Sequence, residues 1–246
     1  TCEAYGYTYN TATATCSSYR YNTNLERNIS NINNKINGSR NTTETGTNTV
    51  QINGTSNTTK GFNNNCLING SQNEIANGVN NSTVNGTLGE ATTENTIVLG
   101  ANNPESPLGK KQSIHLMYGR QTTTSGWVAS YLNDTTGDFF NIPDNTAMYF
   151  HADVIAVRVD GTGAGGRGDF ASWVERGVII NKSGVTSIAR ERDIIKNSGT
   201  VTGWNVQSNV SATNTRFLLN VKGAVNVTIE WAANIRFTQI KTGVAL

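Results

Sequence analysis

The sequence predicts an all-β protein, with a β-roll or β-solenoid shaft followed by an antiparallel β-sandwich. The first observation is an octad repeat between Ile36 and Gly86, in which an apolar-Asn-Gly triplet returns every sixteen residues. The second is a series of eight β-branched and aromatic runs in the C-terminal half, separated by turn signals. No segment has a convincing helical period. We expect three segments: an N-terminal extended arm (1–27), the shaft (28–103) and the sandwich (104–246).

The predicted arm is rich in Tyr, Thr and Ala, and its tyrosines alternate with small polar residues. Such alternation indicates a strand or an extended segment that packs on another protein. We therefore expect this segment to attach the chain to a neighbour. The chain starts at Thr1 rather than Met, so we expect a trimmed N-terminus or a piece of a longer protein.

The shaft is predicted from the spacing of its glycines. Glycine adopts positive φ at no steric cost, and Asn tolerates the left-handed region, so a recurring Asn-Gly marks a corner of a coil. The runs between corners are too short for helices, and a short fixed period is typical of solenoids. A disordered Asn/Thr tract is the alternative, but the fixed spacing of the triplets argues against it.

The shaft has few large apolar residues, with one reliable position in each sixteen-residue turn. Burying one Ile or Val contributes about 1.5–3 kcal/mol. Ordering one residue costs about 1 kcal/mol or more, so a single coil would be unstable. We therefore predict a homotrimer, in which the large residues of three chains meet on a shared axis: Ile36, Ile52, Ile68 and Val84.

The predicted sandwich comprises eight candidate strands, several of which alternate apolar and polar residues. Turn signals such as Asp160-Gly161 and Ser183-Gly184 separate them, as in antiparallel sandwiches. The candidate strands are 113–118, 126–132, 147–158, 170–181, 186–190, 203–208, 217–222 and 226–238.

Composition excludes several classes of function. The net charge is +2, only 15% of the residues are charged, and no block of like charges occurs, so nucleic-acid partners are not expected. No apolar run approaches the length of a membrane span, so membrane insertion is not expected. The three cysteines leave two possibilities open: incidental thiols, or a small loop closed by Cys2 and Cys16 with Cys66 separate.

Three motifs are weak indications of chemistry. Gly161–Gly166 fits G-x-G-x-x-G, but a strand-like run follows where a dinucleotide site needs a helix. The Arg167-Gly168-Asp169 triplet needs no explanation in a chain with 25 glycines. His115 and His151 are the only histidines, and neither has metal-ligand spacing. We therefore expect no metal site and no cofactor.

A glycan depolymerase is the enzymatic alternative, since it needs two carboxylates across a sugar-sized groove. No carboxylate pair can be singled out from spacing, because most aspartates lie at turns where Asp is a turn former. We therefore predict no catalytic residues and no enzyme activity. The aspartates considered are Asp134, Asp138, Asp144, Asp153, Asp160 and Asp169.

The C-terminal segment resembles distal modules of tailed-bacteriophage fibre proteins. The resemblance is carried by several runs, of which the closing one, with its Trp231-Ala232 pair, is the most specific. These runs are Ile142–Phe150, Ala152–Arg158, Ser172–Ile179, Gly203–Val206, Phe217–Gly223 and Thr228–Arg236. The shaft looks like the Asn/Gly-rich stalks of such proteins and, more loosely, like the trimeric heads of autotransporter adhesins. The resemblance implies a trimeric virion appendage, attached to other virion proteins through the N-terminal arm.

The resemblance leads to an expected function on the virion surface. We expect a trimeric phage fibre that projects its distal domain for attachment to host-surface glycan, where repeated weak contacts add up. A capsid or neck decoration without a receptor is the first alternative, and a depolymerase spike is the second. Aromatic residues are the candidate glycan contacts, namely Trp127, Tyr131, Trp173 and Trp204, whereas Trp231 is expected in the core.

Overall fold

The computed structural model describes residues 7–10, 15–18, 31, 33–198, 200–211 and 215–242. Within the expected arm, β1 (Tyr7–Asn10) pairs antiparallel with β2 (Thr15–Ser18). The rest of the expected arm, including Cys2, lies outside the described residues. In the described part of the chain every regular element is a strand, and no helix there could span a bilayer.

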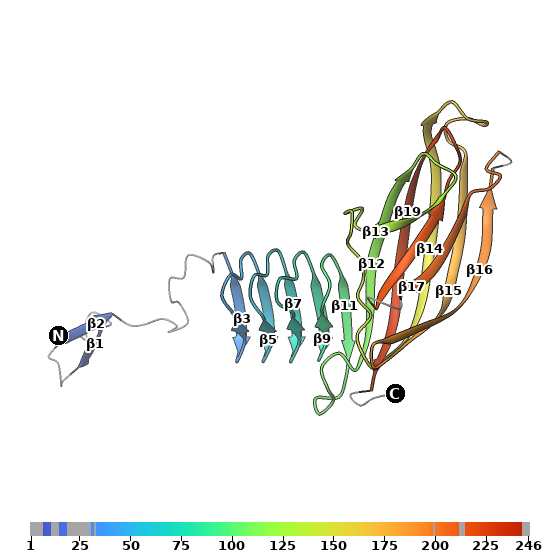
Figure 1. Ribbon diagram of the computed structural model, residues 1–246. Coiled ribbons are helices and arrows are strands. Elements are labelled where there is room, and N and C mark those ends of the chain that lie inside the picture. Colours follow the sequence, from blue (N-terminus) through green and yellow to red (C-terminus); the bar gives the residue numbers. More distant parts are fainter. Residues whose placement is uncertain are drawn as a thin grey trace.

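The octad repeat forms a β-solenoid with two parallel ladders (Figure 1). Triplets sixteen residues apart are direct partners, as in Ile52↔Ile68 and Ile68↔Val84. The coil therefore completes one turn every sixteen residues, which is two octads. The first ladder comprises β3 (Lys35–Ser39), β5 (Gln51–Thr55), β7 (Leu67–Ser71), β9 (Thr83–Thr87) and β11 (Ile97–Ala101), and the second comprises β4 (Thr42–Thr43), β6 (Thr58–Thr59), β8 (Glu74–Ile75) and β10 (Glu90–Ala91).

The glycine of each triplet is required by close approach of neighbouring turns. Gly54 has φ 130°, in the region that favours glycine. A Cβ at Gly54 would lie 1.8 Å from the carbonyl oxygen of Gly70 in the next turn. The repeat therefore keeps glycine here for two reasons, backbone conformation and space.

The interior of the coil is held together by asparagine side chains as well as by apolar ones. Asn57 is fully buried; its Nδ2 donates to the Gly70 carbonyl at 2.9 Å, and its Oδ1 accepts from the Asn73 backbone amide at 3.0 Å. Asn73 repeats both contacts one turn later, with Gly86 and Gly89. Each interior amide thus satisfies a buried donor and a buried acceptor that would otherwise be unpaired.

The residues expected to form a core on a trimer axis lie instead inside the coil of one chain. Ile52, Ile68 and Val84 have no exposed surface, because they pack inside the coil of their own chain. Only Ile36, at the first described turn, is exposed. These side chains therefore do not form a core shared between chains. The sequence argument weighed apolar burial alone against ordering entropy, whereas buried amides such as Asn57 also pair backbone groups inside the coil.

A single sheet runs from the solenoid into the C-terminal part (Figure 1). The last coil strand, β11, pairs antiparallel with β12, with Val98 opposite Ile114. The order then continues β12-β19-β14-β15-β16, all antiparallel. These strands are β12 (Lys111–Thr122), β14 (Thr146–Gly161), β15 (Phe170–Lys182), β16 (Val185–Asn197) and β19 (Val227–Lys241).

A smaller three-stranded layer, β13-β18-β17, is joined to this sheet by a short pairing of β13 with β12 and covers one face of these strands. The two layers meet through packed aromatic rings, including Phe217 edge-to-face against Phe237 with their ring centres 5.2 Å apart. The Tyr118 hydroxyl accepts from the Phe140 amide and donates to the Phe217 carbonyl, and burial raises the pKa of this phenol. The strands of the smaller sheet are β13 (Trp127–Leu132), β17 (Asn205–Ser211) and β18 (Arg216–Lys222).

Two polar features outside the groove regions have structural roles. The glycine-rich loop is held in place because the buried Arg158 guanidinium donates to the carbonyls of Gly161, Gly163 and Ala164. Cys66 is a buried free thiol inside the coil, and burial raises its pKa. Both therefore have structural roles here.

The interior amide ladder predicts a difference between two asparagines of the same turn. Asn57→Ala should destabilise the chain by about 2–4 kcal/mol, because it leaves a buried carbonyl and a buried amide unpaired. Asn53→Ala removes external side-chain ladder contacts to Asn37 and Asn69, whose amides can pair with water instead, and should cost under about 1 kcal/mol. Denaturant unfolding measures both. Equal effects of the two variants would contradict this account of the core.

Candidate functional site

The outward face of the small sheet carries aromatic and amide side chains. Trp127, Lys222 and Asn205 are cross-strand partners across β13, β18 and β17. The next row on the same face contains Asn220 and Gln207. We call this surface, from Trp127 to Tyr131, the amide face. It offers rings for packing and amides that both donate and accept hydrogen bonds.

Tyr131 stands at the solenoid end of the amide face. Its ring contacts Phe139 edge-to-face at 5.4 Å, and the Arg120 guanidinium lies 4.8 Å from its centre. The Arg216 guanidinium in turn lies 5.5 Å from the centre of the Phe139 ring. The two rings are therefore held in place by neighbouring cations.

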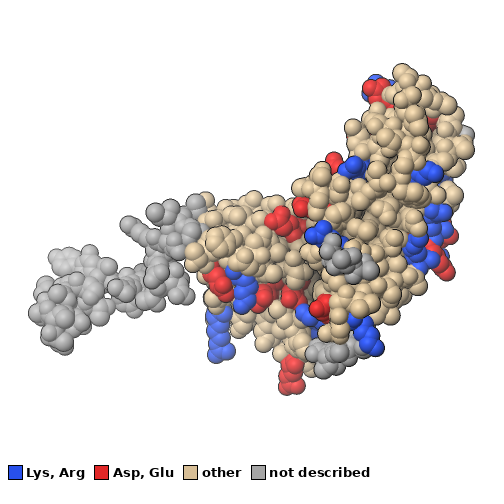
Figure 2. Space-filling model, viewed as in Figure 1, with Lys and Arg blue, Asp and Glu red and all other residues tan. Residues whose placement is uncertain are grey.

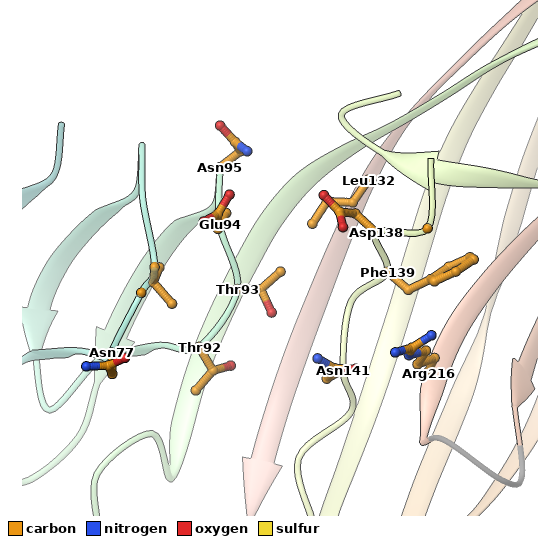
Figure 3. Close-up of a pocket in the computed structure, with 13 residues that line it drawn as sticks. Asn77, Thr92, Thr93, Glu94, Asn95, Leu132, Asp138, Phe139, Asn141 and Arg216 are labelled. Carbon is orange, nitrogen blue, oxygen red and sulfur yellow. The ribbon is translucent and has the colours of Figure 1, made fainter. Parts of the chain in front are cut away.

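A groove of about 430 Å³ begins where the amide face reaches the last turns of the coil. The solenoid supplies one wall and the loop after β13 the other (Figure 3). This volume is within the range of ligand pockets. We call this groove the junction groove. Its lining residues are Asn77, Gly78, Val79, Thr92, Thr93, Glu94, Asn95, Leu132, Gly137, Asp138, Phe139, Asn141 and Arg216.

Two carboxylates stand on opposite walls of the junction groove. Glu94 lies on the coil and Asp138 on the facing loop (Figure 3). Glu94 is partly buried and accepts from Asn80 Nδ2 at 2.7 Å, whereas Asp138 is exposed. The groove can therefore hydrogen-bond hydroxyl groups from both sides, and its carboxylates flank whatever lies between them.

The four predicted glycan contacts divide into two pairs. Trp127 is 45% exposed, and Tyr131 is partly exposed on the same face of β13. Trp173 and Trp204 are buried at 3% and 8%, because both rings pack against Trp231 in the core. The prediction that Trp173 and Trp204 contact glycan is therefore wrong, since a sugar cannot reach their buried rings. Trp231 itself is buried, as expected.

Sequence reasoning considered Asp138 among six aspartates but did not consider Glu94. Glu94 lies in the loop between β10 and β11, Asp138 lies in the loop after β13, and the pairing of β11 with β12 brings these two segments together. The sequence offered one weak signal for Glu94: it is a charged residue just after the octad repeat, in a segment where Asn and Thr are the most frequent polar residues.

The opposite, outward face of the large sheet is also uncovered in this chain. His115, Arg236, His151 and Arg176 are successive cross-strand partners in one row. Desolvation, with the nearby charge of Arg236, lowers the pKa of His115. We call this surface the outer face; its exposed apolar side chains are Ile97, Leu99, Met117, Tyr149, Ile155, Val178, Ile180 and Ile240.

Carboxylates contact part of this row of His and Arg side chains. His151 lies 3.1 Å from Asp153, and Arg176 lies 3.4 Å from Glu191 and 3.2 Å from Asp193. Among the described residues no group of three or more His, Cys, Asp or Glu side chains could hold a metal ion.

Comparison with known proteins gives structural matches only: no family model and no curated protein sequence matches this chain. The tailspike protein of Acinetobacter baumannii phage AM24 is 9% identical over 86% of this chain and 50% of its own, with a TM-score of 0.31. Tailspike protein gp49 of Acinetobacter baumannii bacteriophage Fri1 is 10% identical over 84% and 48%, with a TM-score of 0.27. The Acinetobacter phage vB_ApiP_P1 tailspike protein is 7% identical over 80% and 42%, with a TM-score of 0.25.

The chain thus spans half or less of the length of these tailspikes. The expectation of a protein without enzyme activity is corrected at this point, because the gp49 protein is described as a capsular polysaccharide depolymerase, which is an enzyme. The similarity is weak at these values. The proposals below therefore depend on this chain's own residues.

Proposed function

We propose that this chain belongs to a bacteriophage appendage, and that its C-terminal β-sandwich binds a polysaccharide of the bacterial surface. The observation that carries the proposal is the continuity of the amide face with the junction groove through Tyr131 and Phe139. An extended chain of sugars fits such a surface, because aromatic rings pack on sugar C–H groups while amides and carboxylates pair with hydroxyls. The resemblance of the C-terminal segment to phage fibre modules supports the same role.

A second candidate function is cleavage of the bound polysaccharide. It is favoured by one observation, the placement of Glu94 and Asp138 on opposite walls of the junction groove. Glycoside hydrolysis uses such a pair, with one carboxyl group as the acid and the other as base or nucleophile. Partial burial and the Asn80 contact fix the position of Glu94, whereas exposed Asp138 is open to solvent water.

We further propose that the chain works as a homotrimer on the virion surface, with copies of the chain covering the outer face. Exposed apolar side chains cross this face from β11 to β15, and contiguous apolar patches mark interaction sites. The described ion pairs leave Arg236 without a carboxylate partner. A second copy could supply one, for instance its Glu230, which is exposed on the same face. A capsid or neck decoration stays the alternative location.

Binding is tested with purified surface polysaccharides from a panel of bacteria, immobilised on a biosensor. The full chain should bind at least one of them, and Tyr131→Ala should weaken that binding about tenfold. Phe62→Ala is the matched control, because Phe62 is an exposed aromatic residue on the coil. Unchanged affinity of Tyr131→Ala would count against the proposed site.

Cleavage is tested by the release of reducing ends from a polysaccharide that binds. Glu94→Gln and Asp138→Asn should each lower the rate by about a hundredfold or more, while affinity changes by no more than a few fold. Glu105→Gln, an exposed carboxylate outside the groove, should leave the rate unchanged. If the wild-type chain binds but releases no reducing ends, the second candidate function is wrong.

The trimer is tested by sedimentation equilibrium at micromolar concentration. The wild-type chain should have three times its chain mass of 26.4 kDa. Val178→Glu, on the outer face, should shift the distribution to smaller species, whereas Val225→Glu, exposed in the turn before β19, should not. A folded wild-type monomer would contradict the proposal.

A further inference from the structure

A second groove, of about 530 Å³, opens where the edges of the two layers meet, between β16 and β17. Figure 2 shows Lys and Arg side chains, with Asp and Glu side chains among them, along the edge of the C-terminal part where Figure 1 places β16. We call this second groove the edge groove. Its lining residues are Trp127, Arg190, Glu191, Arg192, Asn205 and Gln207.

One of its two arginines has a structural partner. Glu175 on β15 has no exposed surface; its Oε2 accepts from the Ser208 amide at 2.5 Å, and its Oε1 lies 3.8 Å from Arg190 Nη1. A buried carboxylate without a cation would be strongly unfavourable. Arg190 is therefore largely committed to neutralising Glu175.

Arg192 is in a different situation. Its Nη1 donates to the Asn205 side-chain oxygen and, at 2.7 Å, to the Val206 carbonyl. Both acceptors are neutral, and no ion pair in the described part of the chain involves Arg192. Two hydrogen bonds from one nitrogen hold the guanidinium in place and leave its other N–H groups for a ligand. A planar guanidinium held in this way fits a carboxylate.

Trp127 supplies the second half of the site. It is the exposed member of the four tryptophans, and the other three are buried in the core. Its cross-strand neighbour Lys222 pairs in turn with Asn205, so a ring, an ammonium group and the guanidinium share one surface. The one carboxylate lining the groove, Glu191, lies 3.4 Å from Arg176 and is paired there.

We propose that the edge groove is a subsite for an acidic sugar, such as a uronic acid. Arg192 binds the sugar carboxylate, Trp127 packs on the sugar ring, and Gln207 pairs with a hydroxyl group. The proposal rests on the proposed polysaccharide binding and specifies its ligand class: an anionic polymer whose acidic unit lies at the Trp127 end of the amide face.

The test follows the indole N–H signal of Trp127 in the ¹⁵N-labelled full chain, assigned with Trp127→Phe. Sodium glucuronate and glucose are titrated separately to millimolar concentration. Glucuronate should shift the Trp127 signal with a dissociation constant about fivefold below that of glucose, as expected for one charge-assisted contact. Arg192→Gln should abolish this preference, and Arg167→Gln, a matched charge change in the glycine-rich loop, should retain it.

Equal shifts with both sugars, or no shift with either, would overturn the subsite. A shift with sodium acetate as large as that with glucuronate would overturn it as well, because it would show a site for any carboxylate. Failure of the subsite can be distinguished from failure of the proposed polysaccharide binding. If the Arg192→Gln variant binds the polysaccharide like the wild type, the subsite is wrong, while binding through Tyr131 stands.

Discussion

The structure depends on one backbone junction, the antiparallel pairing of β11 with β12. Up to β11 the ladder is parallel and each strand is the next turn of a coil; beyond it the strands belong to an antiparallel sheet. Because hydrogen bonds are continuous across this point, the coil and the C-terminal part share one sheet. The junction groove can exist only because this pairing places the coil's last turns beside the loop after β13.

The same sheet separates the proposed functions onto its two sides. One side of the C-terminal strands packs under β13, β17 and β18, whose outward face forms the amide face. The other side continues the outer surface of the coil and stays uncovered, with apolar residues and a row of His and Arg side chains. The proposed polysaccharide and the proposed neighbouring chains would therefore occupy different surfaces.

Much of the fold could be predicted from the sequence, because its signals are local. The period of the triplet Ile68-Asn69-Gly70 predicts one strand in each turn, although its Asn-Gly lies within β7 and not at the corner that we expected there. Alternation along 228–237 predicts which side chains of β19 face the core. Other inferences required information that is not local. Asn57 looks like a surface residue until its amide is seen to bridge two turns, and Trp173 looks available until Trp231 stacks on it. The pairing of His115 and His151 with Arg236 likewise arises only from the strand order.

The central claim, that polysaccharide lies along the amide face and into the junction groove, is tested most directly by hydrogen–deuterium exchange. The full chain is compared with and without a bacterial surface polysaccharide that it binds. The account predicts slower exchange in 127–139 and in 92–95, with little change in 147–155. Slower exchange confined to 147–155, or to the coil turns before residue 77, would place the ligand elsewhere and contradict the account.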